Sequence, residues 1–521
     1  MTLPHGNRGS TRWHGAVALT AALGSLFLYL SGMARGLSFA FGGSDGGELA
    51  VAVQTLGIPH PTGYPTYVLL AQAFRALPWR DLAARLNLFS ACCAALSVGA
   101  SSAIARSLLQ EEISEARAQA PPLWPRIVGG ATAGAYLAVA GLFWQEALRA
   151  EVYTLHTALA SLSLLLLLRP SRGTSVVAGF LLGLGLGNHA TMAFYGLGAV
   201  AFLLLKPERP RRKEWLQVAC GVALGLSVYL YLPLRARADP WLNWGNPVDL
   251  ASLWAHVTGA AYRTLLLRVA PGEMLGRLSA AARLLLHDFA PWGAILGALG
   301  VVHLWKQKRA ALMLITVPGV LGLLLALGYG GERSEVHLLS LYLMWATCCG
   351  IGAGLLTERM GKSWRSSIAL TWVFPALALP LAALRGPVLS LREDPGPLPT
   401  LRPVLQSLPS GAIVLTARDE ETFALWYLQA VEKVGTETAV VDARLLSWSW
   451  YRQEIPARYP GVLAPGEGAR DDLLASFLLE NGDHPAYAFA SVQPLPGFRR
   501  ESTGPLYRLT HPGVRHRRKS R

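Results

Sequence analysis

The chain has 521 residues, of which 52% are hydrophobic and only 15% are charged, against about 25% charged residues in an ordinary soluble domain. Lysine and arginine outnumber aspartate and glutamate by 47 to 32, which gives a formal net charge of +15. The basic residues lie in short clusters between long apolar stretches, so the excess fits anionic lipid headgroups and cytoplasmic loops rather than nucleic acid. All five cysteines lie inside apolar stretches without CxxC spacing, which argues against a zinc site or a disulfide framework.

Eleven apolar stretches are each predicted to form a membrane-spanning helix, the first of them uncleaved. Their approximate ranges are 15–33, 86–108, 127–144, 153–168, 174–188, 190–205, 215–233, 290–305, 310–328, 337–356 and 367–385. The sequence therefore predicts a polytopic α-helical membrane protein with about eleven transmembrane helices.

Six clusters of polar and basic residues fall on one side of this scheme, which the positive-inside rule assigns to the cytoplasm. They are Arg8/Arg12, 109–126, Arg169/Arg172, 206–213, 306–309 and 358–365. We expect a multi-pass inner (cytoplasmic) membrane protein with a cytoplasmic amino terminus. The other loops then face the periplasm or the exterior: 34–85, 145–152, 188–189, 234–289, 329–336 and everything after 386.

The first outer loop, residues 34–85, carries an acidic sequence about ten residues after the first span. Asp45 and Glu48 lie three residues apart and share one side of the chain if the stretch is helical. Two short helices, 48–57 and 64–77, are predicted around the proline-rich turn 59–65. Amphipathic helices of this length lie in the headgroup plane, so both carboxylates are expected beside the bilayer surface. The alternative interpretation is a solvated turn built from aspartate and glycine.

Further ionisable residues gather on the same predicted side. Glu151 is expected at the outer membrane surface and His156 about one turn inside it. Intramembrane ionisable groups are costly and are functional candidates, although a structural hydrogen bond between helices explains them equally well. Asn188 and His189 follow the glycine-rich run 183–187. With no strand before it, that run indicates close helix packing rather than a nucleotide-binding loop.

An outward arginine beside tryptophans is the third candidate feature. Arg235 precedes Trp241 and Trp244, and it lies outside against the usual charge bias. A guanidinium could hold a lipid-linked phosphate through paired hydrogen bonds while the tryptophans stack on a sugar. An aromatic belt anchored to headgroups is the alternative interpretation.

The end of the chain has a different pattern, of short apolar strands alternating with helices. Strands are predicted at 411–416, 438–442 and 486–490, with helices at 419–433 and 470–481. The pattern predicts a soluble α/β domain over 410–512. It is expected to follow a membrane domain at 1–386 and a proline-rich linker at 387–409, and to precede a basic tail at 513–521.

Several motifs together carry a family resemblance. They are Asp45-Gly46-Gly47-Glu48, residues 56–65, 85–90, 150–156 and 187–189, Asn243-Trp244-Gly245, residues 423–429 and Trp450-Tyr451. This set resembles the bacterial members of the transmembrane protein O-mannosyltransferase-like family over most of the chain. Two positions depart from the family pattern: Thr62 replaces an expected proline, and Asn246 replaces a common aspartate, which puts a second acidic ligand there in doubt.

The resemblance implies a GT-C fold and an inverting membrane glycosyltransferase. Such an enzyme moves a sugar, mannose among the candidates, from a polyprenyl-phosphate donor to a hydroxyl of a protein or glycan on the outer face. Asp45 would be the base, and Glu48 would orient the loop or the acceptor. Residues expected to bind substrate are His60, Tyr64, Glu151, His156, Asn188, His189, Arg235, Trp241, Asn243, Trp244 and Arg263. No cofactor is assigned; the carboxylates and histidines leave a divalent metal open, but no HExxH spacing requires one.

Two functions of other classes stay open. A transporter or flippase for lipid-linked glycans would use the same basic and aromatic residues. Secondary transporters often have internal repeats and polar groups near the bilayer midplane, whereas this sequence has no repeat and its polar groups cluster on one predicted face. An assembly scaffold that binds a partner through the α/β domain leaves the acidic loop unexplained.

Overall fold

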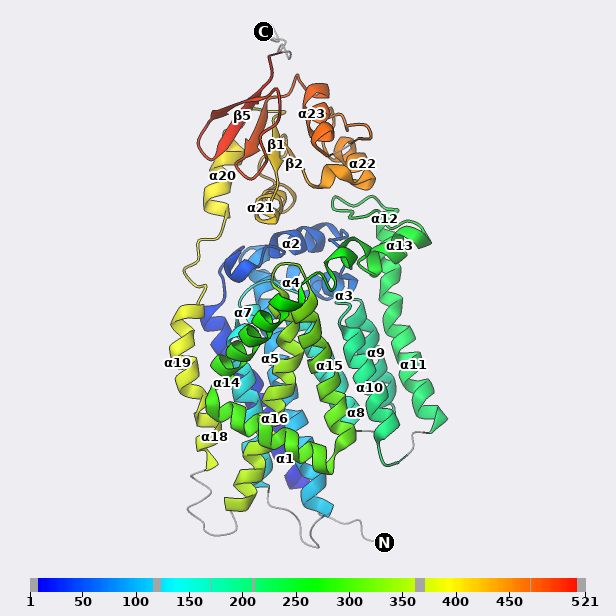
Figure 1. Ribbon diagram of the computed structural model, residues 1–521, viewed down its shortest axis with the longest axis vertical. Coiled ribbons are helices and arrows are strands. Elements are labelled where there is room, and N and C mark those ends of the chain that lie inside the picture. Colours follow the sequence, from blue (N-terminus) through cyan, green and yellow to red (C-terminus); the bar gives the residue numbers. More distant parts are fainter. Residues whose placement is uncertain are drawn as a thin grey trace. The chain divides into compact units, whose positions relative to one another are not determined.

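The structure is a computed structural model that describes residues 8–115, 123–169, 171–208, 211–360, 371–468 and 470–512 (Figure 1). The predicted basic tail 513–521 and parts of the basic clusters at 109–126, 206–213 and 358–365 lie outside the described residues. Two compact units are present. The helical unit comprises Met1–Ala34, Asn87–Tyr229 and Ala261–Arg392, and the mixed unit comprises Arg35–Leu86, Leu230–Ala260 and Glu393–Arg521.

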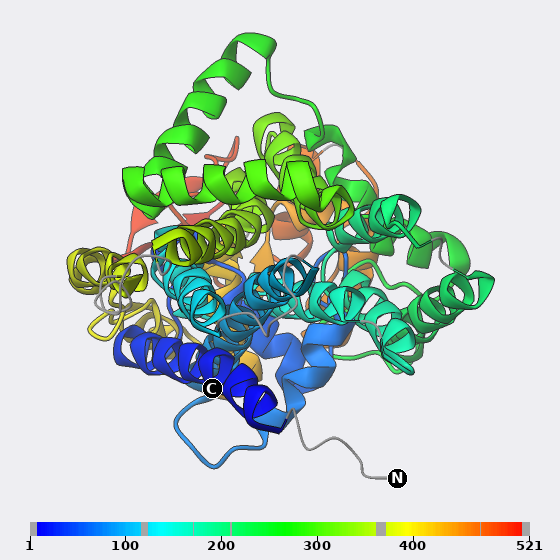
Figure 2. The same ribbon diagram turned by 90° about the horizontal axis from the view of Figure 1, so that it is seen from below.

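The helical unit is built from long apolar helices, many of which are seen end-on in Figure 2. They are α1 (Arg8–Gly32), most of α5 (Leu82–Glu115), α6 (Trp124–Val139), α7 (Gly141–Ala147), α8 (Tyr153–Leu168), α9 (Thr174–Leu186), α10 (Met192–Leu205), α11 (Arg212–Leu226), α14 (Pro271–Gln307), α15 (Arg309–Gly328), α16 (Leu339–Met360), α18 (Val373–Ala376) and α19 (Ala378–Leu389). Short 3₁₀ turns η3 (Ala260–Leu265) and η4 (Ser334–Leu338) connect some of them.

The helices make this chain a multi-pass membrane protein. Among the described residues, six helices are long and apolar enough to cross a membrane, and the bent pair α6–α7 would be a seventh. Four shorter apolar helices lie at Tyr153–Leu168, Thr174–Leu186, Met192–Leu205 and Val373–Leu389. Within the described residues, each of the eleven predicted stretches therefore falls on an apolar helix or helix pair; residues 367–370 of the last stretch lie outside that part of the chain. Eleven crossings stay a prediction.

The helical unit departs from the prediction at the bend between α6 and α7, and it explains the glycines of α9. The stretch 127–144 is not one straight helix, because the chain bends by 69° between α6 and α7. The glycines of α9 serve close packing: a Cβ at Gly183 would lie 2.4 Å from the carbonyl oxygen of Val222 in α11, and one at Gly179 would lie 2.2 Å from that of Val218. Helix packing is thus the structural reason for these glycines.

The mixed unit combines the first loop with the end of the chain. Its helices are α2 (Gly46–Thr55), α3 (Pro65–Leu70), α4 (Gln72–Arg75), α12 (Tyr231–Ala236), α13 (Leu250–Val257), α20 (Leu398–Ser407), α21 (Asp419–Ala430), α22 (Ser449–Arg458) and α23 (Arg470–Glu480). The two helices expected around the proline-rich turn are α2 and the α3–α4 pair. Helix α2 rests on α21: a Cβ at Gly47 would lie 2.7 Å from the carbonyl oxygen of Phe423, so glycine permits this approach.

A five-stranded sheet forms the core of the carboxyl-terminal part. Its strands are β1 (Ile413–Thr416), β2 (Ala439–Asp442), β3 (Ala486–Phe489), β4 (Arg499–Ser502) and β5 (Leu506–Thr510), in the order β2-β1-β3-β5-β4. Strand β1 pairs in parallel with β2 and β3, with Val414 opposite Val440 and Tyr487. Strands β5 and β4 continue the sheet antiparallel. The sequence predicted strands at the positions of β1, β2 and β3, but β4 and β5 were missed; β4 is mostly exposed and lacks an apolar run.

Candidate functional site

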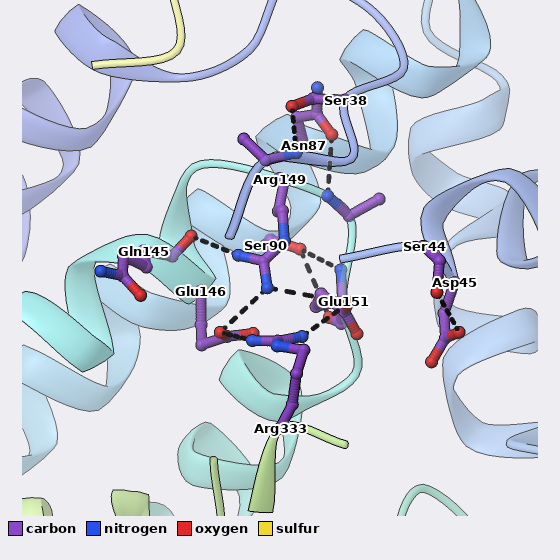
Figure 3. Close-up of polar contacts among 12 residues, drawn as sticks. Ser38, Ser44, Asp45, Asn87, Ser90, Gln145, Glu146, Arg149, Glu151 and Arg333 are labelled. Atoms are coloured by element: carbon purple, nitrogen blue, oxygen red, sulfur yellow. Dashed lines mark hydrogen bonds and ion pairs between the residues drawn. The ribbon is translucent and has the colours of Figure 1, made fainter. Parts of the chain in front are cut away.

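The acidic sequence of the first loop lies at the start of α2, in the mixed unit. Asp45 is the residue before the helix and Glu48 lies in its first turn. Their environments differ sharply: the Asp45 side chain is 33% exposed, whereas that of Glu48 is fully buried. The Ser44 hydroxyl donates a long hydrogen bond of 3.4 Å to Asp45 Oδ1, as Figure 3 shows. One carboxylate is therefore accessible and the other is structural.

His60, from the proline-rich turn, joins the two carboxylates. Its backbone N–H donates to Glu48 Oε1 at 3.0 Å, and its Nδ1 lies 2.5 Å from Glu48 Oε2. On the other edge of the ring, Nε2 lies 2.8 Å from the Tyr64 hydroxyl and 3.9 Å from Asp45 Oδ2. Glu48 thus fixes both the backbone and the ring of His60, and the ring faces Asp45.

The pair of Glu48 and His60 holds a proton. Burial alone would lower the pKa of His60, but the charges of Glu48 and Asp45 and the hydrogen bond to Glu48 outweigh it and raise the pKa to about 10. Burial also raises the pKa of Glu48, against the lowering effect of His60. Both directions describe one proton held between the two groups across a short distance. At neutral pH the imidazole is protonated, and both of its nitrogens act as donors.

A second loop, residues 239–247, completes the surroundings of His60. The backbone N–H of Ile58 donates to the Leu242 carbonyl at 2.7 Å, and that of Trp244 donates to the Ile58 carbonyl at 3.1 Å. Asn243 pairs with Ile58 in a parallel bridge. The Trp244 ring then lies 6.2 Å from His60 and 5.2 Å from the Trp450 ring of α22.

His256 of α13 wedges between these two loops. A Cβ at Gly63 would lie 3.0 Å from His256 Nε2, and one at Gly245 would lie 2.9 Å from Nδ1; both glycines have positive φ. Burial, with a contribution from the charge of His60, lowers the pKa of His256 to about 3, so this ring stays neutral. A neutral imidazole is therefore packed close to a protonated one.

Arg235 and Trp241 lie in the mixed unit but have other partners. Arg235 donates from Nε to the Leu56 carbonyl at 2.7 Å and from a terminal nitrogen to the Thr55 carbonyl at 3.3 Å, so it caps the end of α2. Trp241 packs edge-on against Trp426 at 6.0 Å, with the Arg458 guanidinium 4.3 Å from its ring centroid.

The helical unit holds a second polar cluster, formed by two glutamates and two arginines. Arg149 lies 3.1 Å from Glu146 Oε1 and 3.9 Å from Glu151 Oε1. Arg333 reaches between the same two carboxylates, with an ion pair to Glu146 and a separation of 3.3 Å from Glu151 (Figure 3). Burial would lower the pKa of Arg333, but the charges of Glu146 and Glu151 outweigh it and raise the pKa above its usual range. The cluster is charge-balanced and, except for Arg333, almost fully buried.

Three histidines lie together in this unit. The rings of His156 and His189 are 5.6 Å apart, and His337 of η4 lies 6.0 Å from His189. The Thr191 hydroxyl lies 2.7 Å from His189 Nδ1 and 3.4 Å from His156 Nε2. Asn188 instead donates to the Val152 carbonyl at 3.0 Å and ties the end of α9 to the start of α8.

The predicted site residues are thus divided between the units. The structure brings Asp45, Glu48, His60, Tyr64, Asn243 and Trp244 together in the mixed unit. In the helical unit it brings His156 and His189 together, while Arg263 lies exposed in η3. Glu146, His256 and Trp450 were not predicted as site residues. The spacing of Glu146 and Arg149, three residues apart, was the one available sequence signal.

Within the described ranges, no group of three or more histidine, cysteine, aspartate or glutamate side chains is arranged to hold a metal ion. The divalent metal that the sequence left open therefore has no identified ligand set in that part of the chain.

Comparison with solved structures defines the class of fold. Two crystal structures of ArnT from Cupriavidus metallidurans, one bound to undecaprenyl phosphate and one in the apo state, match 96% of this chain. Their TM-scores are 0.53 and 0.58, their sequence identities 12% and 13%, and the match covers 98% and 97% of those chains. The chain has the GT-C fold that the family resemblance implied.

Comparison with sequences then gives the family. The family model of the protein O-mannosyl-transferase TMEM260 N-terminal domain matches residues 45–214, and that of TMEM260-associated domain 2 matches residues 400–459. The mouse (Mus musculus) protein O-mannosyl-transferase TMEM260 is 25% identical in an alignment 508 residues long; the alignment covers 87% of this chain and 66% of the mouse protein. The predicted similarity to transmembrane protein O-mannosyltransferases is confirmed. The chain spans just under two thirds of the length of the mouse protein.

Proposed function

We propose that this protein is a membrane glycosyltransferase with Asp45 as its catalytic base. The observation that carries the proposal is the arrangement of Asp45, His60 and Glu48. The accessible carboxylate lies 3.9 Å from a protonated imidazole, which a buried carboxylate holds in place. A protonated ring cannot accept a proton, so Asp45 is the basic group of the three.

The reaction is a single displacement at the anomeric carbon of the donor sugar. The acceptor hydroxyl oxygen forms the new bond to that carbon while its proton passes to Asp45. The bond from the carbon to the phosphate oxygen breaks, and polyprenyl phosphate leaves with the electron pair. Attack opposite to the leaving group inverts the anomeric configuration. Positioning of donor and acceptor supplies much of the remaining rate.

The relatives support the choice of donor. One ArnT structure is bound to undecaprenyl phosphate, and the mouse relative is named a protein O-mannosyl-transferase. We therefore propose a polyprenyl-phosphate sugar as donor, with mannose the leading sugar, and a hydroxyl of a protein or glycan as acceptor.

Roles for the other residues follow from their contacts. Tyr64 and Trp244 lie against His60, and Asn243 pairs with Ile58, two residues before it. All three are proposed to contact the sugar or the acceptor. In the helical unit, Glu151, His156 and His189 are proposed to bind the donor sugar, with Asn188 holding the α8–α9 junction and thereby the two histidines.

The donor phosphate needs a cation. Arg235 stays the first candidate. Two of its nitrogens already donate hydrogen bonds to carbonyls at the end of α2, so phosphate binding would compete with this capping role. Arg263, exposed in η3, is the second candidate.

The proposed orientation places the amino terminus in the cytoplasm and the carboxyl-terminal domain outside. Its support is the agreement of six basic clusters with the positive-inside rule. Reporter fusions should place residue 210 inside and residue 450 outside. The opposite location of either reporter would refute the eleven-span scheme.

The decisive experiment is Asp45→Asn in a transfer assay with a polyprenyl-phosphate sugar in detergent. The substitution is nearly isosteric at a partly exposed position, so folding should persist. Turnover should fall by about 10²–10⁴-fold with little change in donor affinity, as expected for loss of a general base. Asp483→Asn, at an exposed aspartate of the same unit, is the matched control and should keep wild-type turnover.

Two results would overturn the proposal. Near-normal transfer by Asp45→Asn would exclude it as the base. Failure of the wild type to transfer any carrier-linked sugar, together with movement of the lipid-linked glycan across vesicles, would favour the transporter or flippase.

A further inference from the structure

The bend between α6 and α7 leaves backbone groups that lipid cannot satisfy. Helix α6 ends at Val139, Ala140 is extended with φ −63° and ψ 120°, and α7 begins at Gly141. The last carbonyls of α6 and the first N–H groups of α7 lose their helical partners there. Within a membrane-spanning segment such groups need partners from the protein itself.

A second break occurs in α14. Ala290 has φ 56° and ψ 167°, and Pro291 follows it. A helix pairs each carbonyl with the N–H four residues later, and proline has no N–H, so the carbonyl of His287 loses its partner. Asp288, which lies between His287 and the break, is 1% exposed.

Two oppositely charged side chains form hydrogen bonds with the unpaired backbone groups at both breaks. Asp288 Oδ2 accepts the N–H of Leu142 at 3.0 Å, in the first turn of α7. Arg385 of α19 donates to the Val139 carbonyl at 2.6 Å, to the Asp288 carbonyl at 3.0 Å and to the orphaned His287 carbonyl. The two side chains also approach each other, with a guanidinium nitrogen 3.5 Å from Asp288 Oδ1.

The signs of these charges match the helix ends that they contact. A helix carries partial negative charge at its carboxyl end and partial positive charge at its amino end. Arg385 lies at the carboxyl end of α6 and Asp288 at the amino end of α7. The site also requires a residue without a side chain, since a Cβ at Gly141 would lie 2.8 Å from Asp288 Oδ1. A third helix secures the carboxylate, because the Tyr342 hydroxyl of α16 donates to Oδ2 at 3.0 Å.

We propose that Asp288 and Arg385 are positioning residues that set the direction of α7 and thereby place the cluster of two glutamates and two arginines. Glu146 lies in the last turn of α7, and Arg149 and Glu151 follow directly. Among the described contacts, neither Asp288 nor Arg385 touches Asp45, the proposed base. Its effect on turnover rests on the proposed transferase function, whereas its effect on α7 does not.

The experiment measures both effects separately in the full-length protein. Asp288→Asn keeps the shape of the side chain but leaves Arg385 without its carboxylate. Asp288→Asn with Arg385→Gln removes both charges, so it folds even if a lone buried charge prevents the single variant from folding. Thr132→Val is the matched control, because its hydroxyl is buried in α6 and donates to the Val128 carbonyl of the same helix.

The first readout is amide hydrogen exchange of the peptide segments 140–151 and 153–168 in detergent. Both variants should exchange at least about tenfold faster than the wild type in 140–151, because opening of α7 becomes easier, and should be unchanged in 153–168. The control should be unchanged in both. Wild-type exchange of 140–151 in both variants would overturn the proposal, whether or not the protein proves to be a transferase.

The second readout is turnover per monodisperse molecule, measured well below the melting temperature of each variant. A merely structural role predicts full activity of the folded fraction. Misplacement of the cluster predicts a loss in kcat of up to about 10²-fold that persists in the double variant even if its melting temperature is restored. Fast exchange of 140–151 with wild-type kcat would show that the pair braces α7 without positioning the site, which also overturns the proposal.

Discussion

Replacing Glu48 with glutamine should cause His60 to lose its proton near neutral pH. The buried carboxylate accepts both the backbone N–H and the ring Nδ1–H of His60. Glutamine can still accept one hydrogen bond, but it carries no charge to hold the imidazolium. Burial then lowers the pKa of His60 against the remaining charges of Asp45 and Asp419, and the ring should become largely neutral near pH 7.

The size of the effect follows from the pKa of His60. It is about 10 in the folded protein against about 6.5 for an ordinary histidine, so at pH 7 the bound proton stabilises the fold by about 4 kcal/mol. The cost of burying Glu48 offsets part of this. Removing one partner of a buried ion pair costs about 3–5 kcal/mol in other proteins, which is the same range.

The sign of the pH dependence is fixed by the raised pKa. The contribution of His60 is fully present below about pH 6.5 and is lost as the pH rises through about 10. The melting temperature of the wild type in detergent should therefore fall between pH 7 and pH 10. That of Glu48→Gln should be low already at pH 7 and nearly flat over the same range.

Glu480→Gln makes the same chemical change at an exposed position of α23 and should reproduce the wild-type profile. Parallel profiles for the wild type and Glu48→Gln would refute the reasoning, since the proton would then be held by something else.

Substitutions at two further positions test the packing of α2 and the cluster of two glutamates and two arginines. Gly47→Ala should destabilise the mixed unit by about 1–3 kcal/mol, because the new methyl meets the Phe423 carbonyl at 2.7 Å; an unchanged melting temperature would mean that α2 and α21 can separate without cost. Arg333→Gln should cost about 3–5 kcal/mol by leaving Glu146 and Glu151 with too little positive charge, and Arg333→Lys should cost less. Equal melting temperatures for both Arg333 variants and the wild type would contradict this account of the cluster.

Much of the fold was predictable because it depends on local sequence. Long apolar runs specify membrane helices without any knowledge of their neighbours. As far as they are described, the eleven predicted stretches accordingly coincide with helices, and the strands β1, β2 and β3 were recognised from short apolar runs. The bend at Ala140 was not predictable, because the carboxylate and the guanidinium that bond its backbone groups lie far away in the sequence.

The candidate site was predictable in its residues more than in its pairings. The spacing of Asp45 and Glu48 indicated that they share a side, but not that one is exposed and the other buried. Glu48 pairs with His60 because the proline-rich turn folds back onto α2. The periodicity of apolar residues in the sequence does not predict this fold of the turn. The same holds for Arg333, whose two carboxylates lie in a distant part of the chain.

The composition of the mixed unit has a consequence for biosynthesis. Three separate stretches of the chain, Arg35–Leu86, Leu230–Ala260 and Glu393–Arg521, build it. Chains are synthesised from the amino terminus, so α2 emerges long before α21, the helix on which Gly47 rests. The acidic loop therefore lacks its packing contact with α21 until most of the polypeptide has been translated. A prematurely terminated chain would carry the membrane helices and both loop carboxylates, yet it would not complete the surroundings of Glu48, so truncation is expected to yield an inserted but inactive protein.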